Sequence, residues 1–263
     1  MDLSDDRPAV RWFLGVPFTP LSLVEAAARI VARPPRAPFA FVTTPNAQHV
    51  VAAHRLNPLF TQPHDRAWLV LNDSRIVGLL AARLFGAPMA IAAGSDLTAT
   101  LFHHHIRPDD ALTIIGASDE VERRLRARFG MRHIARYDPP MGFYRDAAEV
   151  ERCVDFILAH PARYVLLAVG APQSETVACR VLDRGGATGV ALCIGSSLHF
   201  VTGVVRRAPT IFRKLHAEAV YRLMQNPRRH ARRVFVESLP VLSIGLRARV
   251  TSDADPHRRR APP

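Results

Sequence analysis

The sequence lacks the features that mark secreted and membrane-spanning chains. Only Cys153, Cys179 and Cys193 are present, an odd number at wide spacing, so a disulfide framework is not expected. No run approaches the roughly 18 apolar residues that a membrane span needs. The acidic start, 1–6, has neither the basic nor the apolar region of a signal peptide. We therefore expect a cytoplasmic protein with reduced core cysteines, which meets a membrane only peripherally, at the inner face of the plasma membrane.

The sequence also lacks the common nucleotide motifs. No Gly-x-Gly-x-x-Gly follows an expected strand and no Gly-x-x-x-x-Gly-Lys-Ser/Thr is present, which counts against dinucleotide-dependent oxidoreductases and ATPases. The single Asp-x-Asp, 253–255, lies in a tail rich in proline and arginine. The consecutive histidines 103–105 diverge around a helix axis and cannot face one ion together. No metal site and no cofactor is expected.

Acidic residues are scarce where basic residues gather. The chain has 35 basic and 23 acidic residues and a net charge of +12, which favours nucleic acid, anionic lipid or a phosphorylated substrate as partner. Lys214 is the only lysine, so part of the arginine excess is consistent with coding bias. Within 206–233, however, 9 basic residues accompany one acid, Glu218, and alternate with apolar residues. This pattern suits a surface that binds phosphate beside an apolar layer.

Short apolar runs alternate with longer segments of helical periodicity, which predicts a mainly parallel sheet. The expected strands are 39–43, 67–71, 112–115, 164–169 and 190–194, and the expected helices are 21–32, 47–55, 75–85, 97–105, 120–129, 147–160 and 174–183. Because the strands are almost wholly apolar, helices are expected on both faces. The fold class is α/β: a Rossmann-like catalytic domain over 1–205, and a basic helical appendage over 206–263 whose tail from about 251 is expected to be disordered.

Each expected strand ends in a loop with glycine, hydroxyl or Asx residues. In a parallel sheet such loops meet at one edge, where ligands bind, and backbone N–H groups at the next helix start can hold an anion. The loops contain Thr44 and Asn46, then Asp73, then Gly116, then Gly170 and Pro172, then Gly195. Each loop alone is compatible with a simple helix cap. Together they predict a crevice for a nucleotide or sugar phosphate.

If the ligand of this crevice is a nucleotide-linked sugar, its transfer to a hydroxyl with inversion requires a carboxylate that takes the proton of that hydroxyl. Asp73, which follows the strand 67–71, is one candidate. Asp96 is the alternative, because Gly94-Ser95-Asp96 also opens a helix, although an acid there is often a cap. The leaving diphosphate needs positive charge, and arginine supplies it through bidentate contacts where no metal is bound.

A series of short motifs runs through the chain from about residue 41 to 235. The motifs are Thr44-Pro45-Asn46-Ala47, Asn57-Pro58, Asp73, Gly94-Ser95-Asp96-Leu97, Asp138-Pro139-Pro140-x-Gly142-Phe143, Gly170-x-Pro172, Gly195, Gly203, Arg207-Ala208-Pro209, Glu218-x-x-Tyr221-Arg222-Leu223 and Pro227-x-Arg229. No motif is specific alone, but in their order and spacing they together resemble the WecG/TagA/CpsF family of bacterial glycosyltransferases.

The resemblance implies an inverting, metal-independent enzyme that moves an N-acetylmannosaminyl or related sugar from a UDP donor to a polyprenyl-diphosphate-linked acceptor at the cytoplasmic membrane face. By position, Asp73 would be the general base, and Thr44 and Asn46 would lie near the transferred sugar. The substrate-binding residues it implies are Gly94, Ser95, Asp96, Gly170, Pro172, Glu175, Gly195, Arg207, Arg222 and Arg229. The row of strand-end loops adds Gly116, and helical spacing from Arg229 adds Arg232.

The sequence departs from the family pattern at four positions. Ser174 replaces a glutamine, His199 a common acidic residue, Ser74 a glycine and Ala219 a tryptophan. These changes leave the donor sugar open and keep a non-catalytic homologue as an alternative. A basic nucleic-acid-binding protein is a second alternative, disfavoured because the basic region has few aromatic residues and no recognition motif. Nucleic acid is not expected as a partner.

The basic region is followed by apolar segments at 234–236 and 239–246. Together they predict reversible docking on an anionic membrane surface, to which each basic side chain adds about 1 kcal/mol. The alternative is that this apolar segment packs on the catalytic domain or on a second subunit of a homo-oligomer.

Overall fold

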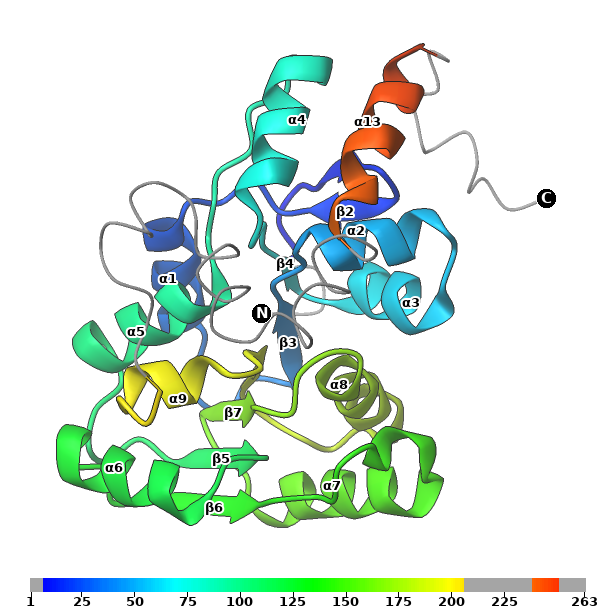
Figure 1. Cartoon of the computed structure of the whole chain (residues 1–263). Helices are drawn as coiled ribbons and strands as arrows, with labels where there is room; N and C mark the ends of the chain where they lie inside the picture. Colours follow the sequence, from blue (N-terminus) through cyan, green and yellow to red (C-terminus); the bar gives the residue numbers. More distant parts are fainter. Residues whose placement is uncertain (1–6, 206–237, 251–263) are drawn as a thin grey trace.

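The protein is built on one six-stranded sheet (Figure 1). The computed structural model describes residues 7–205 and 238–250. The strands run in the order β4-β3-β8-β7-β5-β6, and every ladder between neighbours is parallel. This confirms the expected α/β fold class. The strands are β3 Ala40–Thr43, β4 Leu69–Val70, β5 Leu112–Ile115, β6 Ile134–Tyr137, β7 Tyr164–Leu167 and β8 Val190–Cys193.

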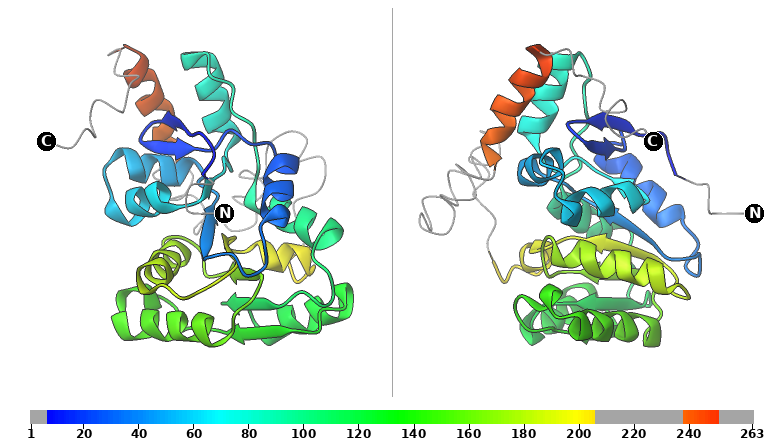
Figure 2. Two further views of the ribbon diagram at one scale, coloured as in Figure 1. Left: turned by 180° about the vertical axis from the view of Figure 1, so that it is seen from behind. Right: turned by 90° about the vertical axis from the view of Figure 1, so that its right-hand side faces the viewer.

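Helices cover both faces of the sheet, as the apolar strands predicted (Figures 1 and 2). Along β7, Val165 and Leu167 belong to one buried cluster, whereas Tyr164 and Leu166 belong to the other, which is the two-residue period of a strand. The first cluster includes residues of α2 Ala47–His54, α3 Pro58–Arg66, α7 Ala147–Ala159 and α8 Gln173–Arg184. The second includes residues of α1 Leu23–Ala32, α5 Gly94–His104, α6 Asp119–Phe129 and α9 Ser197–Val201.

A helix pair and a hairpin extend the first cluster. The hairpin joins β1 Arg11–Phe13 to β2 Val16–Phe18 through Leu14 and Gly15, whose φ angles are 49° and 84°. Helices α4 Arg75–Phe85 and α13 Pro240–Val250 contact each other and project away from the sheet (Figures 1 and 2). The rings of Phe13 and Phe85 meet edge to face with their centroids 5.3 Å apart, so the hairpin packs against the end of α4.

Helix α13 packs on α4 and α2 through one side. Val241 is fully buried in the first cluster. A Cβ atom on Gly245 would lie 3.4 Å from Leu84 and 3.5 Å from Leu80 of α4, so the absence of a side chain allows the close approach. Membrane docking, packing on the domain 1–205 and packing on a second subunit were expected as alternatives for 239–246, and the inner side of this helix packs on helices of 1–205.

The structure corrects several expected bounds. Only Leu69–Val70 of the expected strand 67–71 pairs in the sheet, and the strand expected at 164–169 ends at Leu167. The helix expected from residue 97 begins at Gly94. The sequence pattern did not predict β1, β2, β6, α3, α9 or the short 3-10 helix Phe143–Arg145.

The three cysteines are free thiols, with Cys153 and Cys193 buried and Cys179 partly buried, as expected of core cysteines. Burial raises the pKa of Cys153 to about 12 and that of Cys179 to about 11, which keeps both thiols protonated near neutral pH. Within residues 7–205 and 238–250, no helix is both long enough and apolar enough to cross a bilayer.

If α13 belongs to the core, shortening its buried residue must cost stability. We expect Val241→Ala to lower the free energy of unfolding by about 2 kcal/mol, because it leaves a cavity between α13, α2 and α4. The neighbouring Leu242 is 40% exposed, and Leu242→Ala should cost less than about 1 kcal/mol. Urea unfolding followed by circular dichroism measures both. Equal and small losses would contradict the packing of α13.

Candidate functional site at the loop edge of the sheet

The carboxyl ends of the parallel strands face one edge, and the loops named from the sequence lie there. Thr44 and Asn46 follow β3, Asp73 follows β4, and Gly195 follows β8. Gly170 and Pro172 follow β7, and Gly116 follows β5. Because β4, β3, β8, β7 and β5 are consecutive in the sheet, their loops form one continuous row. The structure therefore brings the predicted loops together.

Hydrogen bonds join the loops after β3 and β4. The N–H of Leu71 donates to the carbonyl of Thr43 at 2.9 Å, and the N–H of Asp73 donates to the carbonyl of Pro45 at 3.1 Å. These bonds continue the β3–β4 ladder beyond the strands themselves. Asp73 is half-buried beside Thr44-Pro45-Asn46, whereas its rival Asp96 is exposed in the first turn of α5.

Asn72, which the sequence analysis did not single out, organises the loop that carries Asp73. It is 2% exposed, and its Oδ1 accepts from the N–H of Ser74 at 2.9 Å. Its carbonyl accepts from the N–H of Ala92 at 2.9 Å, which ties the start of α5 to the same loop. The available signal was an amide side chain directly after an apolar strand, a position that favours an Asx turn.

The first residue of α5 lies directly against Thr44. A Cβ atom on Gly94 would lie 2.6 Å from Oγ1 of Thr44, so no larger residue fits without moving that side chain. The hydroxyl of Thr98 donates to the carbonyl of Gly94 at 2.7 Å and holds the first turn. Thr44, the Asp73 loop and the start of α5 thus form one corner of the site.

The three remaining loops pack against one another through glycine. A Cβ atom on Gly116, whose φ is +84°, would lie 2.6 Å from Val169 in the loop after β7. A Cβ atom on Gly195 would lie 3.7 Å from the Cα of Gly170. The peptide between Ala171 and Pro172 is cis. The backbones of the loops after β5, β7 and β8 are therefore adjacent.

Helix starts at this edge are of two kinds. Asn46 and Ser74 cap α2 and α4, since their side-chain oxygens accept from the N–H groups of Gln48 and Val77. In contrast, α5, α6, α8 and α9 have no side-chain cap bond within the described part of the chain. The first N–H groups of a helix that lack such a cap can bind an anion, and the helix dipole favours negative charge there.

Two residues that were named from the sequence, Ser174 and Glu175, are buried in the first turn of α8. Ser174 is 1% exposed, and its hydroxyl donates to the carbonyl of Leu167 at 3.0 Å, so it is turned away from any ligand. Glu175 is 3% exposed, and its Oε2 has no hydrogen-bond partner among the described residues. Burial raises the pKa of Glu175 from 4.5 to about 7. Glu175 therefore lies beneath the loops rather than at their surface.

His199 and Ser95 lie near the same edge. His199 is half-buried on α9, and its Nδ1 has no hydrogen-bond partner in the parts of the chain that the structure describes. Ser95 borders a small cavity of about 140 Å³ between α5 and α9, together with His103, Arg128 and Phe200. The ring centroids of His103 and His104 are 6.3 Å apart and the two rings are tilted relative to each other, so the rings do not converge on one point.

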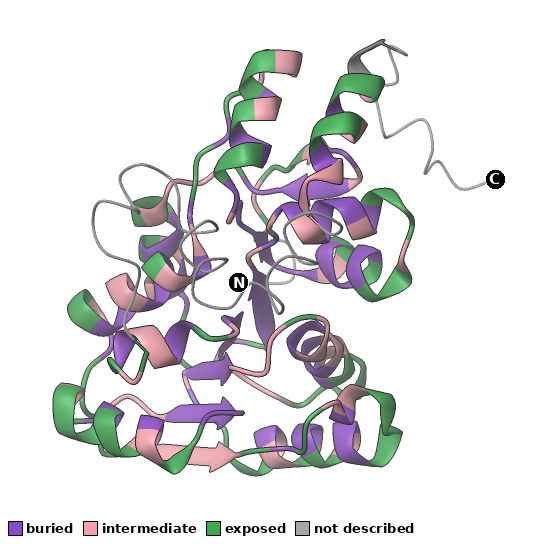
Figure 3. Ribbon diagram, viewed as in Figure 1, coloured by how far each residue is buried: buried purple, intermediate pink, exposed green. Residues whose placement is uncertain are grey.

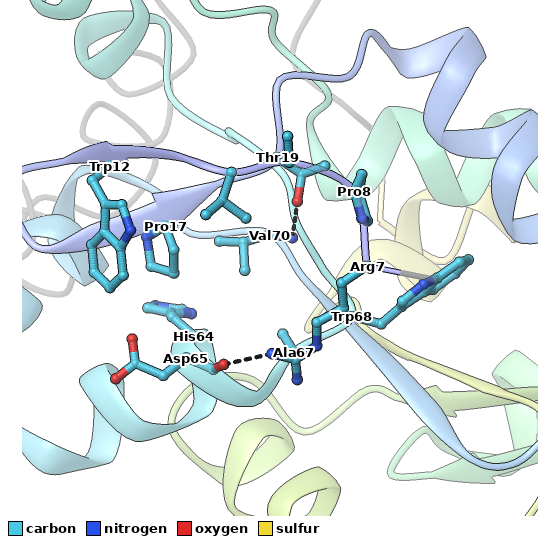
Figure 4. A pocket seen from close by; sticks show the side chains of 12 residues that line it. Arg7, Pro8, Trp12, Pro17, Thr19, His64, Asp65, Ala67, Trp68 and Val70 are labelled. Atoms are coloured by element: carbon cyan, nitrogen blue, oxygen red, sulfur yellow. Dashed lines mark hydrogen bonds between the residues drawn. The ribbon is translucent and has the colours of Figure 1, made fainter. Parts of the chain in front are cut away.

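A larger cavity, of about 790 Å³, lies beside β4, between the hairpin and the segment that joins α3 to β4 (Figure 4). Trp12, His64 and Trp68 are among its walls. Thr19 closes one side, because its N–H donates to the carbonyl of Val70 at 2.8 Å and its Oγ1 accepts from the N–H of Val70 at 3.0 Å. None of the residues singled out from the sequence lines this cavity, and the loop edge remains the candidate site.

Some predicted residues lie outside the described ranges. These are Arg207, Arg222, Arg229 and Arg232, the Asp-x-Asp at 253–255 and the tail from about 251. In residues 7–205 and 238–250, no three His, Cys, Asp or Glu side chains group as metal ligands.

Comparison with known proteins covers nearly the whole chain. The model of the glycosyl transferase WecG/TagA/CpsF family matches residues 11–255. A relative from Bacillus spizizenii (strain ATCC 23059 / NRRL B-14472 / W23) is named N-acetylglucosaminyldiphosphoundecaprenol N-acetyl-beta-D-mannosaminyltransferase. It is 28% identical over 223 residues, which are 83% of this chain and 82% of the relative. The family match includes both the loop edge and α13.

The buried carboxyl group of Glu175 predicts a pH-dependent stability. Its pKa in the folded protein, about 7, lies above the ordinary value of 4.5, so the folded chain keeps a proton that the unfolded chain releases. The free energy of unfolding should therefore fall as the pH rises from about 4.5 to about 7, and level off above it. Glu175→Gln should remove this fall. At pH 8 the variant should exceed the original chain by on the order of 2–3 kcal/mol.

Urea unfolding of both proteins across the pH range measures this difference. Near pH 4.5 the two should be almost equally stable, because the carboxyl group is then neutral in both states, and this serves as the internal control. A constant difference at all pH values would contradict the buried, protonated state.

Proposed function

Because the chain belongs to the glycosyl transferase WecG/TagA/CpsF family, we propose that it transfers a sugar of the N-acetylmannosamine type, or a related one, from a UDP donor to a polyprenyl-diphosphate-linked sugar. The reaction inverts the anomeric centre, needs no metal ion, and serves cell-surface polysaccharide synthesis. The relative's printed acceptor, an N-acetylglucosaminyl diphosphoundecaprenol, supports the class of acceptor. The enzyme works peripherally at the inner face of the plasma membrane.

The observation that carries the proposal is the corner where Asp73, Thr44 and Gly94 meet. An acceptor hydroxyl placed there gives its proton to the Asp73 carboxylate and forms a bond to the anomeric carbon of the donor. The bond from that carbon to the UDP oxygen breaks on the opposite face, and the electron pair leaves with the diphosphate. General base catalysis of this kind contributes about 10²–10⁴-fold to the rate.

Thr44 and Asn46 are proposed to border the transferred sugar. The Oδ1 of Asn46 accepts from the N–H groups of Gln48 and His49 at 2.9 and 3.4 Å, which fixes the amide plane. A fixed amide can then donate from its nitrogen to a sugar hydroxyl. Thr44 is held between β3 and the start of α5 and can offer its hydroxyl to the same ring.

The negative charge that develops on UDP is proposed to be stabilised in two ways. The starts of α5 and α8, which have no side-chain cap bond among the described residues, present backbone N–H groups at the loop edge. The arginines of the basic region, Arg207, Arg222, Arg229 and Arg232, supply charge in place of a metal ion.

The direct test is UDP release by the full chain in EDTA, with a panel of UDP-sugars and a short-chain lipid-diphosphate acceptor. Asp73→Asn should lower kcat by about 10²–10⁴-fold, because the amide cannot take the proton. The substitution keeps the shape and the backbone bond to Pro45, so the melting temperature should not change. Asp96→Asn tests the rival base, and Asp109→Asn, at an exposed position before β5, is the matched control whose kcat should stay near that of the original chain.

Two results would contradict this assignment. A loss of activity in Asp96→Asn with normal activity in Asp73→Asn would exchange the roles of the two acids. No UDP release from the original chain with any donor would support a non-catalytic homologue instead.

The arginines are tested by single substitutions, because truncation at residue 206 would also remove α13 and expose the buried sides of α2 and α4. Arg222→Gln and Arg229→Gln should each lower kcat by about 10²–10³-fold, the usual cost of removing one transition-state donor. Added Mg²⁺ should not restore the rate. Arg36→Gln, at an exposed position on the body, is the control. Full recovery with Mg²⁺, or a dependence of the original chain on metal, would contradict the metal-independent mechanism.

A further inference from the structure

Both tryptophans of the chain border the same cavity. The chain has 2 tryptophans, Trp12 of β1 and Trp68 just before β4, and each lines the cavity of about 790 Å³ beside β4. Figure 4 shows the two indole rings at opposite ends of this space. Small-molecule sites in proteins have volumes of roughly 300–1,000 Å³. The two largest aromatic side chains are therefore gathered at one place that has room for a ligand.

The inner wall of this cavity is buried and largely apolar. Ala67, Trp68 and Val70 form part of it, and all three are buried. Strands β2 and β4, which contribute Pro17 and Val70, are buried along their length (Figure 3). Flat aromatic and apolar surfaces of this kind favour a ligand that presents carbon-bound hydrogens to them.

One polar group in this wall lacks an acceptor for its proton. Thr19 is 3% exposed, and its Oγ1 accepts from the N–H of Val70 at 3.0 Å. A hydroxyl group also donates one hydrogen bond, and this hydroxyl donates none within the part of the chain that the structure describes. A buried donor without a partner costs free energy. A ligand that offers an oxygen atom to Thr19 removes this cost, whereas a hydrocarbon chain would not.

The charged groups at the cavity balance each other. Its lining includes one arginine, Arg7, and one carboxylate, Asp65, and both residues are exposed. The guanidinium group of Arg7 donates to the carbonyl of Asp65 at 2.9 Å and to the carbonyl of Arg66, so the main chain already engages it. The cavity therefore has no surplus of positive charge for a phosphate group and no surplus of negative charge for a cation. This balance favours a neutral ligand.

We propose that this cavity binds a neutral saccharide, with a pyranose ring packed on Trp12 and its hydroxyl groups bonded to Thr19 and Asp65. One face of a pyranose ring presents carbon-bound hydrogens, and its rim carries hydroxyl groups that both donate and accept. This ligand class combines the apolar face, the polar rim and the neutrality that the cavity favours. A nucleoside diphosphate lacks a counter-charge there, and a hydrocarbon chain leaves Thr19 unsatisfied.

The cavity is separate from the loop edge, although both adjoin β4. None of the residues named as site residues from the sequence lines it. The N–H of Thr19 donates to the carbonyl of Val70 at 2.8 Å, and Asp73 lies farther along the same segment, beyond the end of β4. The next step rests on the proposed function. A saccharide in the cavity is a second ligand beside the reacting acceptor, and it does not compete with UDP at the loop edge.

The test is titration of the full chain with three neutral disaccharides: N,N′-diacetylchitobiose, cellobiose and maltose. Because both tryptophans line the cavity, their fluorescence reports binding at this place. At least one disaccharide should change the emission and give the same dissociation constant by calorimetry. An excess of UDP should not displace it. Uridine and 1-decanol, which represent a stacking base and a hydrocarbon chain, should bind more weakly.

Two substitutions remove the contacts that the proposal names. Trp12→Leu should weaken binding by about tenfold or more, because the flat aromatic face is lost, and Trp12→Phe should recover part of the affinity. Asp65→Asn, at an exposed position, should weaken binding by about tenfold, because a hydrogen bond to a carboxylate is stronger than one to an amide. Calorimetry measures all three variants, and Trp68 still reports by fluorescence in the two Trp12 variants.

Matched controls lie outside the cavity. Phe129 is a half-buried aromatic residue at the end of α6, and Asp109 is an exposed acid before β5. Neither residue lines the cavity. Phe129→Leu and Asp109→Asn should leave the dissociation constant of the disaccharide within about twofold of the original value. The melting temperatures of Asp65→Asn and Asp109→Asn should stay close to that of the original chain, because both positions are exposed.

The proposal is overturned if no disaccharide binds, if UDP displaces the bound disaccharide, or if Trp12→Leu and Asp65→Asn bind as tightly as the original chain. Tighter binding of uridine or 1-decanol than of every disaccharide would also overturn it. UDP release by the original chain is measured in parallel. Saccharide binding without UDP release contradicts the proposed function alone, whereas UDP release without saccharide binding contradicts only the saccharide site.

Discussion

The geometry of the site depends on the parallel pairing of β3 with β4 and on its continuation past the strand ends. β4 pairs through only two residues, Leu69 and Val70, yet backbone bonds extend the contact to Leu71 and to Asp73. The backbone position of Asp73 is therefore set by main-chain bonds to the Thr44 loop. Asn72 then ties the same loop to the start of α5. A short edge strand thus fixes three segments that are distant in sequence.

The central strands could be predicted because they are buried on both faces and read as continuous apolar runs. β6 could not, because it is the edge strand and is only half-buried throughout. Its Arg136 donates to the carbonyl of Ala117 at 2.9 Å and pairs with Glu122 on α6. An arginine in the middle of a four-residue strand obscures the apolar signal. In β4, by contrast, the apolar run 67–71 is longer than the strand, because only Leu69 and Val70 pair with β3.

The row of loops was predictable from topology, but the roles of individual side chains within it were not. Ser74 and Ser118 both precede a helix after a strand, yet the structure gives only Ser74 a side-chain cap bond. Glu175 reads as an ordinary acid in the first turn of a helix, where the dipole favours its charge. Its burial beneath the loops reverses that expectation, because desolvation outweighs the dipole and favours the neutral form. Burial of this kind depends on how α8 meets β8 and leaves no mark in the local sequence.

The distribution of ion pairs gives the arginine excess a structural meaning. On the body, many arginines face acids: Arg126 pairs with Glu122 at 2.9 Å, and Arg184 pairs with Glu151 and Asp155 at 2.6 and 2.9 Å. Coding bias alone would enrich arginine everywhere, but it would not remove acids from α4 and α13. Acids of the described chain pair with arginines over α6, α7 and α8, whereas the sequences of α4 and α13 contain no acid. The basic region 206–233 is followed along the chain by α13, which contains arginine and no acid. The surplus of positive charge therefore continues from the basic region into α13. Such a surplus of positive charge favours polyanionic ligands, of which the diphosphate of the proposed substrates is one.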